Sequence, residues 1–231
     1  MRKLKNNNLP IIMLSVILLS FISCNNFKGG SIEEGEIEYE VTYPSSNTNN
    51  YLVSLLPSSI YYTFKDDNAC ISIKVSMGLV TTKFISNFKK KEATQTLSLL
   101  GKKYASVINA KEVNKLIEKE PVFSIKLQPE QKKIAGYNCK KAHIDFASDS
   151  LDDFDIFYTD EIAIADPNWS SPFRKINGVL MEFRIHKYGV DMVLKAKNVT
   201  RKEIEDSQFE ISDDYKKISM NEMDEMFSDM E

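Results

Sequence analysis

The sequence is poor in the residues that most enzymes use for acid–base and nucleophilic chemistry. It has two histidines, His143 and His186, and both share the polar face of their predicted strands, so both are expected to face water. It contains no glycine-rich phosphate loop, no zinc-ligand spacing and no Gly-x-Ser-x-Gly elbow. These absences favour a protein that is not an enzyme and holds no cofactor, although a hydrolase that uses only carboxylates leaves little trace in a sequence.

The chain also lacks an excess of positive charge. It carries 30 Lys+Arg against 33 Asp+Glu. Three of the cations, Arg2, Lys3 and Lys5, lie in the first 23 residues, so the remaining residues carry 27 cations against 33 anions, a net charge of −6. A nucleic-acid partner would require a basic surface, and this composition argues against one.

No apolar run is long enough for a membrane-spanning helix, which needs about 20 residues. Residues 11–22 are apolar except for two serines, follow the three cations, and end at Ser23 and Cys24. This layout is typical of a bacterial lipoprotein signal peptide, which would be removed before Cys24. The alternative is an ordinary secretory signal that is cleaved nearby.

A lipidated Cys24 would anchor the exported protein in the membrane without spanning it. The next residue is Asn25 rather than the aspartate associated with retention in the inner membrane, so we expect the outer membrane of a diderm bacterium. Residues 25–34 include Gly29 and Gly30 and have few apolar side chains, so residues 24–34 are predicted to be a flexible tether.

Cysteine is scarce as well. Apart from Cys24, the chain has only Cys70 and Cys139, an even pair in an oxidising compartment. Both lie on the more polar face of their predicted strands. A disulfide would require neighbouring strands with Cα atoms less than about 7 Å apart. The alternative is two separate thiols.

Most of the remaining chain alternates between apolar and polar residues with period two, as in strands with one wet face. Two helices are predicted, one capped by Asn109 with Glu112 and ended by Pro121, the other capped by Ser219 with Glu222. The pattern predicts a mainly β protein, with a single domain over 35–231 built on one large curved antiparallel sheet, a half-barrel with two helices. The expected strands cover residues 37–43, 58–65, 69–76, 79–88, 94–100, 103–108, 122–128, 138–147, 153–160, 179–187, 190–199 and a short one at 208–211.

Residues 132–142 read K-K-I-A-G-Y-N-C-K-K-A. This stretch resembles the K-x-I-x-G-Y-x-C-x-K-A segment of exported lipoproteins of unknown function that are related to the GLPGLI family. Gly178 matches the glycine of that family's P-G-L-I segment, although Asn177 replaces the proline. The resemblance, which spans about residues 35–228, implies a fold like that of the lipoprotein-localisation carriers, with a hydrophobic groove between an incomplete barrel and a lid of helices. It carries over no catalytic residues.

The strongest candidate site is an apolar face on the last predicted hairpin. Met181, Phe183 and Ile185 share one face of residues 179–187, and Met192 and Leu194 share one face of the next strand. In an open half-barrel this surface could hold an acyl chain. The alternative is that these side chains are ordinary core.

Two further features are candidates for the same groove. The methionine-rich C-terminal helix has three possible roles. It packs on the sheet as part of the core, it forms a lid that contacts a ligand through Met223 and Phe227, or it binds Cu(I) through its thioethers. Trp169, the single tryptophan, lies in the irregular segment 165–177 and either stacks on a ligand or closes the edge of the sheet. The other methionines of the helix are Met220, Met226 and Met230.

These features lead to three functional hypotheses. The first is a membrane-anchored envelope lipoprotein that binds lipid or another apolar ligand without catalysis. The second is a structural or interaction protein of the cell envelope that has a protein partner and no small ligand. The third is a periplasmic Cu(I)-binding protein.

Overall fold

The strands of this protein form one continuous open sheet. The computed structural model describes residues 32–44, 56–75, 78–187 and 190–228, which belong to one compact unit. The predicted signal peptide, Cys24, most of the tether and Met230 lie outside these residues. The described strands are β1 (Glu34–Thr42), β2 (Ser59–Lys65), β3 (Asn68–Val75), β4 (Val80–Asn87), β5 (Glu92–Leu99), β6 (Lys102–Asn109), β7 (Phe123–Ile134), β8 (Tyr137–Phe146), β9 (Phe154–Thr159), β10 (Val179–Lys187), β11 (Val190–Thr200) and β12 (Lys216–Lys217).

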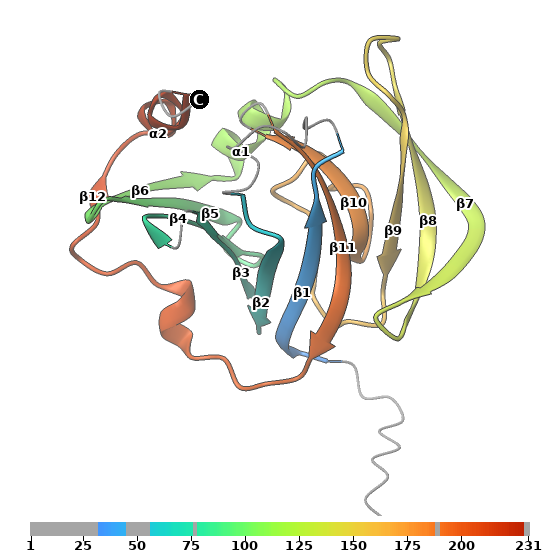
Figure 1. Cartoon of the computed structure of the whole chain (residues 1–231), viewed down its shortest axis with the longest axis horizontal. Helices are drawn as coiled ribbons and strands as arrows, with labels where there is room; N and C mark the ends of the chain where they lie inside the picture. The colour runs from blue at the N-terminus through green and yellow to red at the C-terminus, as the bar shows by residue number, and fades with distance from the viewer. Residues whose placement is uncertain (1–31, 45–55, 76–77, 188–189, 229–231) are drawn as a thin grey trace, which may run out of the picture. The chain divides into compact units, whose positions relative to one another are not determined.

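The order of strands across the sheet is β12-β6-β5-β4-β3-β2-β1-β11-β10-β9-β8-β7. Strands β1 to β6 form one antiparallel half in chain order, and helix α1 (Ala110–Ile117) then leads to β7 at the far edge (Figure 1). Strands β7 to β11 return, so that β11 pairs with β1 and joins the halves. The expected fold class, a large curved antiparallel sheet that stays open, with two helices, is confirmed.

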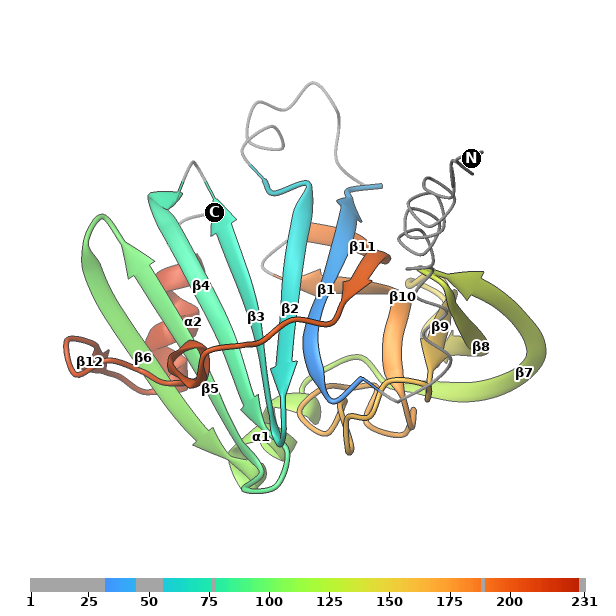
Figure 2. The ribbon, with the colours of Figure 1, turned by 90° about the horizontal axis from the view of Figure 1, so that it is seen from below.

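The two faces of the sheet differ in what covers them. Ile37, Tyr39 and Val41 of β1 point to the inner face and are at most 5% exposed. Helix α2 (Met220–Ser228) packs on this face over Leu97 of β5. The C-terminal segment 201–217, here called the strap, crosses the outer face of the first half. In Figure 2 the strap passes in front of strands β2 to β6 and α2 lies behind them.

The prediction of a strand at 208–211 was wrong. The chain instead forms the 3-10 helix η3 (Asp206–Phe209), and the short strand comes later, as β12, paired in parallel with β6. A strand needs a free neighbouring edge, and the strap reaches the edge of β6 only at Lys216 and Lys217. The outer face expected to be wet is therefore partly covered.

Strand β7 is longer than predicted, because it continues through Pro129 to Ile134. Proline cannot donate to a sheet, but β7 is an edge strand and shifts its register between Gln128 and Gln131, so the missing N–H is tolerated there. A two-residue turn follows. Ala135 and Gly136, with φ of 48° and 89°, join Ile134 to its partner Tyr137 as a tight hairpin.

The capping prediction for the first helix is confirmed. The Asn109 side chain accepts hydrogen bonds from the backbone N–H of Lys111 and Glu112, and the Glu112 carboxylate accepts one from the Asn109 N–H. A reciprocal pattern joins Ser219 and Glu222 at the start of α2. These caps satisfy N–H groups that the first turn of a helix leaves unpaired.

Replacing Asn109 with alanine is expected to lower the free energy of unfolding by about 1 kcal/mol, because two backbone N–H groups lose their acceptor. Urea denaturation followed by circular dichroism measures this. Lys111→Ala, an exposed change in the same turn, is the control. An Asn109→Ala midpoint equal to that of the control would show that the cap does not stabilise the helix.

Candidate functional site

The candidate site lies on the inner face where the two halves of the sheet meet. Val41 pairs with Leu194, which pairs in turn with Phe183, so the three side chains form one rung across β1, β11 and β10. Val41 and Leu194 are at most 5% exposed, whereas Phe183 is half-buried. The sheet therefore begins to expose apolar surface at this rung.

The next rung toward the β10–β11 connection is more open. Ile185 pairs with Met192, and both are half-buried. Tyr43 directly follows β1 and packs against the same core cluster. We call Tyr43, Phe183, Ile185 and Met192 the apolar strip. Tyr62, Ile71 and Ile73, on β2 and β3, are also half-buried against this cluster.

No member of the apolar strip carries a charge. The Tyr43 hydroxyl donates to the Pro57 carbonyl over 2.6 Å, and burial raises the pKa of Tyr43 to about 12. The phenol therefore stays neutral at physiological pH. An uncharged, partly covered surface of this kind suits an apolar ligand.

Tyr39, which is buried in the core next to the strip, fixes the position of Phe183. Its hydroxyl donates to the Leu180 carbonyl over 2.6 Å, and its ring meets Phe183 edge-on at 5.7 Å. The β9–β10 register shifts between Leu180 and Glu182, which interrupts the ladder at the carbonyl that Tyr39 binds. Burial, together with the nearby Tyr62 and Cys139, raises the pKa of Tyr39 well above its ordinary value, so the hydroxyl remains a donor.

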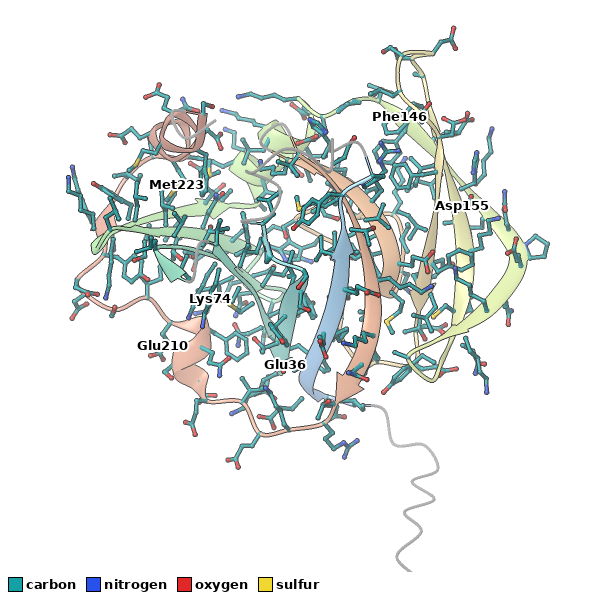
Figure 3. The ribbon with its side chains drawn as sticks, viewed as in Figure 1. Glu36, Lys74, Phe146, Asp155, Glu210 and Met223 are labelled. Carbon is teal, nitrogen blue, oxygen red and sulfur yellow. The ribbon has the colours of Figure 1, made fainter. Side chains whose placement is uncertain are left out.

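A phenylalanine cluster continues the apolar surface toward the β7 edge. Phe123, Phe146, Phe154 and Phe173 lie with ring centroids 5.6 to 6.2 Å apart, and only Phe173 is fully buried (Figure 3 labels Phe146). Phe183 and Ile185 of the strip pack against the buried cluster that contains Phe173, as well as against the main core. On the edge strand β7, Leu127 is 69% exposed. Apolar surface on the inner face therefore extends from β10 in both directions across the sheet, toward β11 and toward β7.

The structure brings together five of the predicted ligand-binding residues. Met181 and Leu194 are fully buried in the core cluster that supports the strip, and Phe183, Ile185 and Met192 stand at its surface. Sequence reasoning missed Tyr43. Period-two alternation along the strand predicted over residues 37–43 puts Tyr43 on the same face as Ile37, Tyr39 and Val41, so this pattern could have identified it.

The other predicted contacts lie elsewhere. Met223 and Phe227 of α2 are buried with Leu97, and Met220 and Met226 are half-buried members of that separate cluster. Trp169 is 6% exposed and its indole N–H donates to the Ser86 hydroxyl over 2.7 Å, which fastens segment 165–177 to β4. Met223 and Phe227 therefore belong to a cluster separate from the strip, and Trp169 is a buried member of the main core cluster rather than a member of the strip.

The two strand cysteines are separate thiols. Cys70 lies on β3 and Cys139 on β8, and five strands lie between them in the sheet. Six steps of about 4.8 Å put them about 29 Å apart along the sheet, whereas a disulfide needs Cα atoms within about 7 Å. The disulfide considered from the sequence does not form in this structure.

Charged side chains gather on the outer face of the second half. Lys132 of β7 lies 3.0 Å from the Glu182 carboxylate of β10 and 3.6 Å from the ring centroid of Phe157. Both histidines face aspartates, His143 at 2.8 Å from Asp155 and His186 at 2.9 Å from Asp191. Among the described residues, no group of three or more His, Cys, Asp and Glu side chains could hold a metal ion.

Comparison with known proteins is informative only for the fold. No protein-family model and no curated protein matches the chain. Among solved structures, the chain is similar to PNGF-II, determined in a P21 space group, with 17% identity and a TM-score of 0.52. The match covers 84% of this chain and 33% of PNGF-II, so the chain spans about a third of that structure's length. At this identity the likeness shows the fold alone.

Cys70 and Cys139 are expected to resist alkylation in the folded protein, because burial raises the pKa of each thiol to about 11. At about pH 8, few native thiols are ionised, and the thiolate is the form that reacts. Iodoacetamide labelling followed by peptide mass spectrometry measures the rates, with the urea-unfolded protein as control. Equal rates in both states, or a mass two hydrogens short, would contradict the separate buried thiols.

Proposed function

We propose that the protein is an exported, lipid-anchored envelope protein that binds an apolar ligand, a lipid or an acyl chain, without catalysis. The observation that carries this proposal is the apolar strip. It is uncharged, half-buried, continuous with the core, and placed on the inner face of an open sheet. Residues 132–142 support a relationship to GLPGLI-related lipoproteins.

The burial pattern limits the size of the ligand. Met181 and Leu194 are already covered by protein, so a ligand would contact the strip rather than pass through the core. Each CH₂ group that leaves water on binding contributes about 0.8 kcal/mol. A single acyl chain lying along Tyr43, Met192, Ile185 and Phe183 is therefore the favoured ligand.

Ile185→Gln is expected to weaken palmitate binding by about tenfold or more, because an amide without a partner replaces apolar surface at the centre of the strip. The Cys24→Ala form of the full chain, purified without detergent, is titrated with palmitate by calorimetry. Leu79→Gln, on a leucine that is 58% exposed outside the strip, is the matched control.

Native mass spectrometry of the same protein shows whether an extractable lipid accompanies it. Unaltered palmitate affinity in Ile185→Gln would place binding away from the strip. No binding and no co-purified lipid would reject the ligand proposal.

One observation favours the alternative, an envelope interaction protein without a small ligand. Most inner-face side chains are covered by the protein's own packing. This alternative predicts a lipid-free protein and a specific partner in cross-linking of whole cells. For Cu(I), full burial of the Met223 side chain beside Leu97 argues against three convergent thioethers.

Cys24→Ala is expected to move the protein from the membrane fraction to the soluble periplasm, because the sulfur that carries the lipid is lost. Fractionation with immunoblotting measures the change, and density separation of the two membranes tests for the outer membrane. Cys70→Ser is the control, since its thiol lies in β3. A Cys24→Ala protein that stays with the membrane would refute anchoring through this residue. Among the described residues, no helix is long and apolar enough to cross a membrane.

A further inference from the structure

The strap forms an arch over the outer face of the first half of the sheet. Before the arch, the Lys65 ammonium bonds the Asp206 carboxylate over 2.7 Å and the Ile204 carbonyl over 3.0 Å. After it, Lys103 bonds Asp214 over 2.5 Å. Ile204 is 1% exposed, so its side chain also anchors the strap. Residues 207–212 span the distance between these two attachments, and we call them the arch.

A cavity of about 230 Å³ lies beneath the arch. Holding one water takes about 10–15 Å³, so the space admits a small molecule. Its floor belongs to β4 and β5, and its position on the outer face separates it from the apolar strip. Figure 3 shows Glu210 on the strap and Met223 of α2 on the opposite side of these strands. The cavity is lined by Lys83, Thr96, Ser207, Glu210, Ile211, Ser212 and Tyr215.

The charges at this cavity differ from those that hold the strap. Lys65 and Lys103 are engaged in ion pairs, as described above. Within the described part of the chain, the Lys83 ammonium from the floor and the Glu210 carboxylate from the arch have neither an ion pair nor a hydrogen bond. Opposite walls thus offer one cation and one anion to a ligand.

Two further groups add polar and aromatic contacts. Thr96 is 3% exposed, and its hydroxyl accepts the Lys83 backbone N–H over 3.2 Å, which leaves its proton to donate. The Tyr215 ring has the Lys103 ammonium 5.5 Å from its centroid and also lines the cavity. A ligand here would find a donor, a cation, an anion and a ring within one small space.

We propose that the cavity under the arch binds a small zwitterion of the α-amino-acid class. The Lys83 ammonium and the Thr96 hydroxyl bind the carboxylate, the Glu210 carboxylate binds the ammonium, and Tyr215 lies against the side chain. Complementary charges on both ends select a zwitterion over an ion of either sign alone. This site is independent of the apolar strip, because it lies on the other face of the sheet.

The test uses the intact protein and titrates glycine, L-serine and L-glutamine separately, with acetate and methylamine as probes of single charge. Binding is followed by calorimetry and by backbone amide shifts in NMR spectra. We expect at least one amino acid to bind with shifts confined to Lys83, Thr96 and residues 207–215. Lys83→Gln and Glu210→Gln should each weaken binding by about tenfold or more, since each removes a charge-assisted hydrogen bond.

Matched controls remove the same charges outside the cavity. Lys74→Gln on β3 and Glu205→Gln on the strap should leave the affinity unchanged, and the amide spectra verify that every variant is folded. Three results would overturn the proposal. The first is that no amino acid binds at concentrations up to about 10 mM, well above a millimolar Kd. The second is that acetate binds as tightly as the amino acids, and the third is that Lys83→Gln and Glu210→Gln bind as tightly as the controls.

Discussion

The pairing of β1 with β11 is the contact on which the rest of the structure depends. It joins a half built from residues 34–109 to a half built from residues 123–200, across up to 164 positions of sequence at Glu36 and Thr200. The junction is tight, because a Cβ atom on Gly35 would lie 2.4 Å from the Thr200 carbonyl oxygen. Tyr39 then bonds the Leu180 carbonyl and reaches β10 across β11. Without this junction, the rung of Val41, Leu194 and Phe183 would lose its β1 member, and Tyr43 would be separated from Ile185 and Met192.

The same junction divides the molecule into two chemically different faces. The inner face carries the apolar strip and the cover formed by α2. The outer face carries ion pairs such as Lys132 with Glu182, and the strap. A ligand at the strip and a ligand under the arch would therefore be recognised by different forces, burial of apolar surface in one case and paired charges in the other.

Local patterns predicted most elements because their causes are local. Alternation located eleven strands, and side chains three residues apart capped both helices, as at Asn109 and Glu112. The same reasoning failed at 208–211, since a strand also needs a free edge beside it. It placed Phe183, Ile185 and Met192 on a common face, because a single hairpin holds them. Sequence reasoning could not show that Met223 and Phe227 lie away from these residues. The sequence of an amphipathic helix gives its apolar face but not the surface on which that face packs.

The sequence by itself determined the strand-rich class, the helix caps, the hairpin that carries the strip and the expectation of lipidation at Cys24. Tertiary structure alone decided that β11 pairs with β1, that five strands lie between Cys70 and Cys139, and that the strap arches over Lys83. The physical reason is the sequence separation over which each interaction acts. Periodicity and capping act over a few residues, whereas strand order and cavity walls depend on contacts between residues far apart in the chain.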